Sequence, residues 1–323
     1  MQLRSTYAPW LETIVASRYD TYHLEGGGFS SSGERVSPKG TLGITPIRGF
    51  TVYGTYAEGY RAPAVTETLI QGLHPAAFPA NFGFIPNPAL RPEVGKNKEL
   101  GVNLRYDNIA LPGDAFRGKF NVYKNDLTDF IEFTVVAGPR CPPPSPFCLQ
   151  YQNIPSARIE GWEFDTNYDA GHFFLGFAGS HVRGRNTITG VPLLKIPPDQ
   201  YATTVGARFL DRKVTVAVRW LAVNAKLRED IPNSAAISGN PDLPPTGSYN
   251  LVNLYAGYQP TPDITWALSV ENLLNVQYAP YLNAYASGNG VLPFPSPGIT
   301  VKGSLAVRLG GPDTSSKVAL ITK

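Results

Sequence analysis

The segment KNKELGVNLRYD, residues 96–107, decides the fold class because its apolar side chains recur at every second position. The apolar positions are Leu100, Val102, Leu104 and Tyr106. A period of two is that of a β-strand with one apolar face. The segments 213–220, 264–271 and 301–309 repeat this pattern, and none of these apolar faces carries a charge.

Similar segments recur along the whole chain and predict about twelve strands. We expect them near residues 8–22, 37–46, 49–60, 96–107, 115–134, 151–168, 172–184, 200–210, 213–225, 247–258, 262–273 and 299–309. No helical periodicity of useful length lies between them. The predicted fold class is therefore all-β.

The predicted connections alternate between short and long. Short ones are expected near 47–49, 107–113, 169–171, 210–212 and 259–262, and long ones near 23–36, 61–95, 135–150, 185–199, 226–246 and 274–298. A transmembrane antiparallel β-barrel has tight turns on its periplasmic rim and long loops on its extracellular rim. A soluble sandwich or propeller is the alternative, but its strands are usually shorter.

Composition excludes several classes of protein. Charged residues make up 16% and hydrophobic residues 42% of the 323 residues, a balance that argues against disorder. The sequence contains no run of about 18 apolar residues, so no transmembrane helix is expected. The net charge of +3 is too balanced to indicate a nucleic-acid partner.

The sequence offers little support for an enzyme. We find no nucleophile elbow, zinc motif or phosphate loop. Asp126 and Asp129 form a carboxylate pair by spacing, but they belong to the predicted strand 115–134. We therefore expect no catalytic residues.

Cys141 and Cys148 are the two cysteines and bracket the segment CPPPSPFC. No histidine or further cysteine accompanies them, which argues against a metal knuckle. A local disulfide at a loop tip is favoured over two free thiols, and it would imply an oxidising compartment. The N-terminal residues show no apolar signal-peptide core, so no export signal is expected in this chain.

Four segments resemble parts of TonB-dependent outer-membrane receptors. They are YGTYAEGYRAPAVTETL (53–69), NPALRPEVGKNKELGVN (87–103), YQNIPSARIEGWEFD (151–165) and WALSVENLLNVQYAPYLNAY (266–285) followed by GITVKGSLAVRLG (298–310). In the last of these, the residues that match the family's corner and the start of its final strand are Asn272, Leu273, Leu274, Asn275, Tyr278 and Gly298. The resemblance extends over residues 7–310.

The resemblance implies a barrel of about 22 strands closed by an N-terminal plug. About twelve strands and no plug are expected here, so residues 1–310 resemble the C-terminal part of such a barrel. Residues 311–323 form an atypical tail, because the family's last strand usually ends at an aromatic residue. The implied location is the outer membrane of a Gram-negative cell. The implied partners are outer-membrane lipid and the TonB–ExbB–ExbD system, which acts through the plug.

Within this family, the haem and haemoprotein receptors are the most similar to this chain. They carry two short boxes that flank a loop with a haem-ligating histidine. Residues matching the first box are Tyr60, Arg61, Ala62 and Pro63, and those matching the second are Asn87, Pro88, Ala89 and Leu90. His74 lies between the boxes, so the resemblance implies that it is an axial ligand of haem iron. Haem would be the transported ligand and not a permanent cofactor.

Other residues are secondary candidates. Phe78, Phe82 and Phe84 are expected to offer an apolar wall to a porphyrin face. His181, near the outer end of strand 172–184, is a candidate second extracellular contact. Two rival interpretations stay open at this point. One is a ferric-siderophore receptor in which His74 is an ordinary residue, and the other is a truncated, non-functional receptor remnant.

Overall fold

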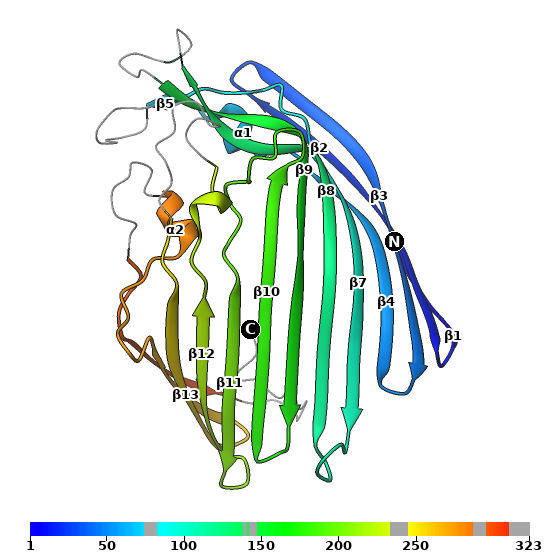
Figure 1. The fold of residues 1–323 in the computed structure, drawn as a ribbon, viewed down its shortest axis with the longest axis vertical. Helices are drawn as coiled ribbons and strands as arrows, with labels where there is room; N and C mark the ends of the chain where they lie inside the picture. Colours follow the sequence, from blue (N-terminus) through cyan, green and yellow to red (C-terminus); the bar gives the residue numbers. More distant parts are fainter. Residues whose placement is uncertain (74–82, 138–140, 142–146, 233–244, 287–294, 310–323) are drawn as a thin grey trace.

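A computed structural model of the protein describes residues 1–73, 83–137, 141, 147–232, 245–286 and 295–309 (Figure 1). The chain forms a strongly curved antiparallel sheet whose strands run roughly side by side (Figure 1). The predicted all-β class is confirmed. None of the described helices has the length or the apolar run that crossing a membrane requires.

The long strands follow one another around the sheet in chain order. They are β1 (Gln2–Ala8), β2 (Leu11–Gly26), β3 (Phe29–Ile47), β4 (Phe50–Arg61), β7 (Glu93–Asp107), β8 (Ala115–Ala137), β9 (Phe147–Asp169), β10 (Phe173–Asn186), β11 (Gln200–Phe209), β12 (Val214–Val223), β13 (Tyr249–Thr261), β14 (Ile264–Glu271) and β15 (Thr300–Val307). The short elements are α1 (Val65–Leu69), β5 (Gly72–Leu73), β6 (Gly83–Phe84), the 3-10 helix η1 (Arg228–Asp230) and α2 (Tyr281–Ala286).

The prediction of a long loop at 23–36 is wrong. β2 and β3 continue through this region and pair as far as Gly26 and Phe29. Gly27 and Gly28 make the turn with φ values of 59° and 82°. A two-residue turn with positive φ at both positions matches the twist of a hairpin, and glycine adopts it without steric cost. β1 was also missed, because its alternation is short.

The predicted loop at 135–150 is shorter than expected. β8 extends to Ala137 and β9 begins at Phe147, and these two residues are partners in the ladder. Beyond Thr128, β8 no longer pairs with β7, and before Ala157, β9 no longer pairs with β10. Residues 130–137 and 147–154 therefore form a two-stranded extension, which we call the ribbon.

The connections separate by length onto two rims. The turns after β3, β7, β9, β11 and β13 lie on one rim, whereas α1, β5 and α2 lie at the other (Figure 1). The β2–β3 turn is the exception, since it is tight but lies on the long-loop rim. Otherwise the predicted segregation agrees with the structure.

One face of the sheet carries exposed apolar side chains in most strands. They include Leu100 in β7, Val122 in β8, Leu175 in β10, Trp220 in β12 and Leu268 in β14. Leu100, Trp220 and Leu268 are positions that the period-two pattern assigns to the apolar faces. An apolar outer face interrupted by few polar groups is the surface that a membrane barrel presents to lipid.

Candidate functional site

The first sequence box ends β4 and closes the loop at 62–92. Arg61 donates from Nε and Nη2 to the two carboxylate oxygens of Glu93, at 2.6 and 2.7 Å. Its Nη1 donates to Glu67 Oε2 at 2.8 Å, and Glu67 in turn accepts a hydrogen bond from the backbone N–H of Ala64. Arg61 therefore joins the start of the loop, helix α1 and the end of the loop.

Glu93 lies at the centre of this closure. It is 9% exposed, and its Oε1 also accepts the backbone N–H of Ile131 in the ribbon at 2.6 Å. The hydrogen bond from Arg61 to Glu93 raises the pKa of Arg61, so the guanidinium stays charged. A bidentate arginine–carboxylate pair has a defined geometry as well as a favourable energy.

The rest of the first box packs the same region. Pro63 is buried and Ala62 is half-buried. The Tyr60 ring lies 6.4 Å from the ring of Tyr22 in β2, centroid to centroid. The backbone oxygen of Tyr60 accepts a hydrogen bond from Arg18 Nη2 at 3.3 Å.

The second box ties the returning part of the loop to the ribbon. Asn87 Nδ2 donates to the backbone oxygen of Tyr151 at 2.8 Å, and its backbone N–H donates to Thr68 O at 2.9 Å. The Asn87 side chain also accepts the N–H of Ala89, and Pro88 lies between them half-buried. Leu90 is 3% exposed. The boxes are thus connected through α1.

Between the boxes, β5 and β6 form a minimal hairpin. Gly72 pairs with Phe84 and Leu73 with Gly83. β6 also pairs in parallel with β9 of the ribbon, Gly83 with Cys148 and Phe84 with Leu149. His74 follows β5 directly. His74, Phe78 and Phe82 lie outside the described residues, and their predicted roles stay predictions.

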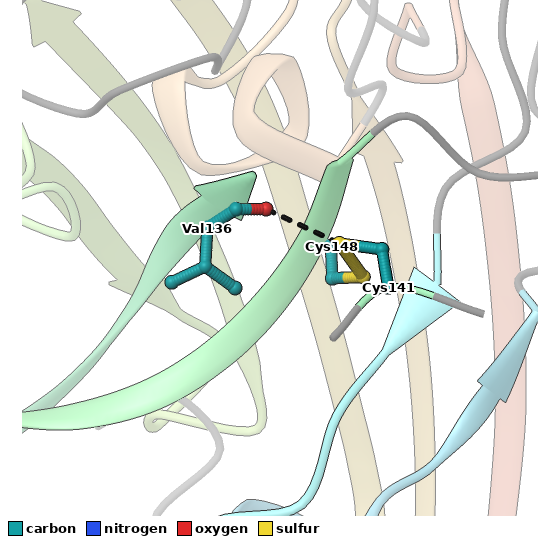
Figure 2. The surroundings of a disulfide bond; sticks show 3 residues. All are labelled: Val136, Cys141 and Cys148. Carbon is teal, nitrogen blue, oxygen red and sulfur yellow. Dashed lines mark hydrogen bonds between the residues drawn. A yellow bond between two sulfur atoms is a disulfide. The ribbon is translucent and has the colours of Figure 1, made fainter. Parts of the chain in front are cut away.

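The cysteines lie at this attachment point. Cys141 and Cys148 form a disulfide with a Cα–Cα distance of 5.6 Å (Figure 2). The Cys141 sulfur lies 3.4 Å from the backbone oxygen of Val136 (Figure 2). Cys148 is completely buried. The disulfide therefore includes Cys148, the residue that pairs with Gly83 of β6.

His181 lies apart from this loop assembly. Its ring stacks on that of Trp162 at 5.8 Å, and its Nδ1 is 2.7 Å from Asp199 Oδ1. By alternation it shares the face of β10 that carries Phe177 and Leu175, which is the exposed apolar face. The structure does not bring His181 to the loop boxes.

A buried polar cluster on the other side of the ribbon was not anticipated. Glu132 Oε1 accepts the N–H of Leu194 at 3.1 Å, and Tyr281 donates its hydroxyl to the oxygen of the same Leu194 at 2.9 Å. Lys226 is 6% exposed and lies 5.4 Å from the Tyr281 ring centroid. Leu193 and Ile196 pack beside this contact against Leu127. No short-range sequence signal joins residues so distant along the chain.

This cluster predicts a pH-dependent contact between the ribbon and residues 193–196. Burial raises the pKa of Glu132 to about 7, although the Leu194 N–H lowers it. A carboxyl whose pKa is higher in the folded state stabilises that state when protonated. We expect protection of the Leu194 amide from hydrogen exchange, corrected for the intrinsic rate, to fall about tenfold or more between pH 5 and pH 8. In Glu132→Gln this dependence should be lost, and an unchanged pH profile would contradict the assignment.

Metal-binding groups are sparse in the described part of the chain. Residues 1–73, 83–137, 141, 147–232, 245–286 and 295–309 contain no group of three or more His, Cys, Asp or Glu side chains placed to hold an ion. The arrangement is that of a framework which holds a loop by its base.

Comparison with known proteins supports the architecture. The chain is 26% identical over 258 residues to the hemin receptor of Yersinia enterocolitica, an alignment that covers 76% of this chain and 36% of the relative. The solved structure of the copper transporter OprC superimposes with a TM-score of 0.74 at 17% identity, covering 95% of this chain and 46% of that chain. The Serratia marcescens hemophore receptor HasR was solved with its hemophore HasA and heme. It superimposes with a TM-score of 0.68 at 22% identity, covering 95% of this chain and 50% of that chain.

The chain therefore spans between about one third and one half of the length of these proteins. At these identities, the structural neighbours show the fold alone. The profile of the family described as "TonB dependent receptor-like, beta-barrel" matches residues 1–273. This family consists of outer-membrane transport receptors and not of enzymes. The chain belongs to the TonB-dependent receptor β-barrel family.

Proposed function

We propose that this chain is the C-terminal barrel portion of an outer-membrane receptor that takes up haem or haem from a haemoprotein. Residues 1–310 form the barrel portion in this proposal, and residues 311–323 form a tail. The protein binds and passes its ligand without changing it chemically. Import depends on a plug and on TonB–ExbB–ExbD.

The observation that carries the proposal is the connection of the two boxes at the base of one loop. Arg61 and Asn87 both bind to α1 or to residues in contact with it, and the β5–β6 hairpin continues from there. His74 follows Leu73 of β5 immediately in the sequence. The match to a protein named hemin receptor supports the same ligand.

The chemistry follows from an imidazole in a loop whose base is anchored. Neutral imidazole is a common ligand of haem iron. An anchored base limits the conformational entropy that the loop loses when the ligand binds. Phe84 on β6 is half-buried and pairs with Gly72 of β5. We assign Phe78, Phe82 and Phe84 to the apolar contacts with the porphyrin.

A hemin titration of the purified protein in detergent, followed at the Soret band, tests the proposal. We expect His74→Ala to weaken binding by about tenfold or more, or to change the spectral type, because an iron ligand is lost. His172→Ala is the matched control, since His172 lies at the β9–β10 turn on the opposite rim. Circular dichroism should show equal β-structure in all samples.

A folded protein without any Soret shift would reject the haem assignment. Binding that His74→Ala leaves unchanged would reject His74 as the iron ligand. Tight binding of a ferric siderophore by the same sample would then favour a siderophore receptor. Failure of the wild-type chain to give β-structure in detergent would favour the non-functional remnant.

A further inference from the structure

Residues 83–91, which we call the return arm, bring the end of the loop back along the ribbon. The arm starts as β6, in which Gly83 pairs in parallel with Cys148 and Phe84 pairs with Leu149 of β9. A ladder of this kind is held by backbone N–H and C=O groups of both strands. The return arm therefore begins as an additional strand of the ribbon, next to β9.

Prolines end this backbone pairing. The N–H of Ile85 still donates to the oxygen of Leu149 at 3.1 Å. Beyond it the sequence places Pro86, Pro88 and Pro92, none of which carries a backbone N–H. A regular ladder cannot continue past residues that lack this donor. Further contacts between the return arm and β9 therefore need donors other than the backbone.

Side-chain amides supply these donors. Gln150 Nε2 on β9 donates to the oxygen of Pro86 at 3.0 Å. In the opposite direction, Asn87 Nδ2 on the return arm donates to the oxygen of Tyr151 at 2.8 Å. An amide side chain offers two N–H donors and a carbonyl acceptor, so it can replace a backbone group that is missing from a ladder. The pairing is thus continued by amides after the prolines have interrupted it.

Asn153 makes the most complete of these contacts. Its Oδ1 accepts the backbone N–H of Arg91 at 2.9 Å, and its Nδ2 donates to the oxygen of the same Arg91 at 2.9 Å. Nδ2 also donates to the backbone oxygen of Asp129 at 2.8 Å. A side chain that both accepts from and donates to the backbone of one residue imitates a neighbouring strand. Asn153 therefore selects which residue of the return arm lies opposite it.

Asp129 completes this contact from β8. It lies where the pairing of β8 with β7 has ended and has a φ value of 57°. A positive φ in a residue other than glycine is uncommon and persists where surrounding contacts hold it. The Asp129 carboxylate accepts a hydrogen bond from Arg91 Nη2. Asn153, Asp129 and Arg91 thus join β9, β8 and the return arm at the base of the ribbon.

We propose that Asn153 is a positioning residue that sets the register of the return arm on β9 and thereby places the loop containing His74 for binding of haem iron. This inference rests on the proposed role of His74. A slip of the arm by one residue would shift it by about 3.3 Å. Groups that bind a ligand must be held to within about 0.5 Å of their productive geometry. The register of the arm is therefore a requirement for iron coordination and not only for stability.

Asn153→Asp tests the register with little change in side-chain size. The carboxylate keeps an acceptor for the Arg91 N–H but has no donor for the oxygens of Arg91 and Asp129. Without hemin, we expect the amide of Ile85, at the other end of the pairing, to exchange about tenfold faster than in the wild type. Asn103→Asp is the matched control, because Asn103 is exposed on β7 and its side chain bonds to none of the described residues.

The spectrum of bound hemin separates positioning from folding. Asn153→Asp should bind hemin about tenfold more weakly and should show the spectral type of His74→Ala, while circular dichroism shows unchanged β-structure. Added imidazole should restore the wild-type spectral type in both variants, because it supplies the missing iron ligand from solution. A purely structural defect would reduce the amount of folded protein and leave the spectrum of the bound hemin unchanged.

Three results would overturn the assignment of Asn153. They are unchanged exchange at Ile85, a wild-type hemin spectrum in Asn153→Asp, and a spectral change that imidazole does not reverse. Failure of the wild-type protein to give any Soret shift would reject the haem proposal instead. In that case, exchange at Ile85 would still decide whether Asn153 sets the register of the return arm.

Discussion

Arg61→Ala should release the loop at 62–92 from the barrel and weaken ligand capture. The substitution leaves Glu93, a carboxylate that is 9% exposed, without its cation, and it also frees Glu67 beside α1. Removing one partner of a buried pair costs about 3–5 kcal/mol. Because the Arg61 side chain is 43% exposed, water compensates in part, and we expect a loss of about 2–3 kcal/mol.

Hydrogen exchange reports this loss directly. The amides of Thr68 and Asn87 bond to Ala64 O and Thr68 O, and both should exchange about 30-fold faster or more in the variant. Hemin affinity should fall with them. Arg4→Ala is the control, since Arg4 pairs with Glu12 at the same 2.7 Å but is 66% exposed, so it should have little effect. Unchanged exchange at Thr68 would show that Arg61 does not hold the loop.

Gly161→Val should prevent the sheet from assembling correctly. A Cβ at Gly161 would lie 2.1 Å from the backbone oxygen of His181 and 2.9 Å from the hydroxyl of Tyr123. A backbone oxygen in a paired strand cannot move away without breaking ladder hydrogen bonds. The expected cost is at least about 3 kcal/mol, at the upper end for overpacking.

The heat-modifiable mobility of the folded barrel in gel electrophoresis measures assembly. Gly161→Val should give mostly the unfolded band, and Gly161→Ala should show the same defect more weakly. Gly40→Val is the matched control, because it lies inside β3 and a Cβ there meets no atom within 4 Å. A normal folded band for Gly161→Val would contradict the predicted clash.

The lack of space for a side chain at Gly161 explains part of the motif YQNIPSARIEGWEFD, which was identified from the sequence only by its resemblance to the family. The sequence alone gives no reason for a glycine at this position. In the structure, it makes room for Tyr123 on β8 and for the backbone of β10. Both neighbours are distant along the chain, so no local pattern predicts the steric limit.

The sequence by itself determined the strands, their apolar faces and the family. These depend on the period-two alternation and on turn residues, which are local properties. Where a local pattern was weak the prediction failed: β1 was too short to recognise, and the Gly27–Gly28 turn was assigned to a long loop.

Only the tertiary structure decided what the boxes do and which charges meet. Arg61 binds Glu93 because β4 and β7 pair, and Asn87 binds Tyr151 because the loop folds back on the ribbon. Glu132 accepts a hydrogen bond from residue 194, which lies in the connection after β10. Lys98 faces Lys124 through the register of β7 and β8. Such contacts depend on ladder register and on loop packing, which bring together residues far apart in the chain. Local sequence patterns therefore do not predict them.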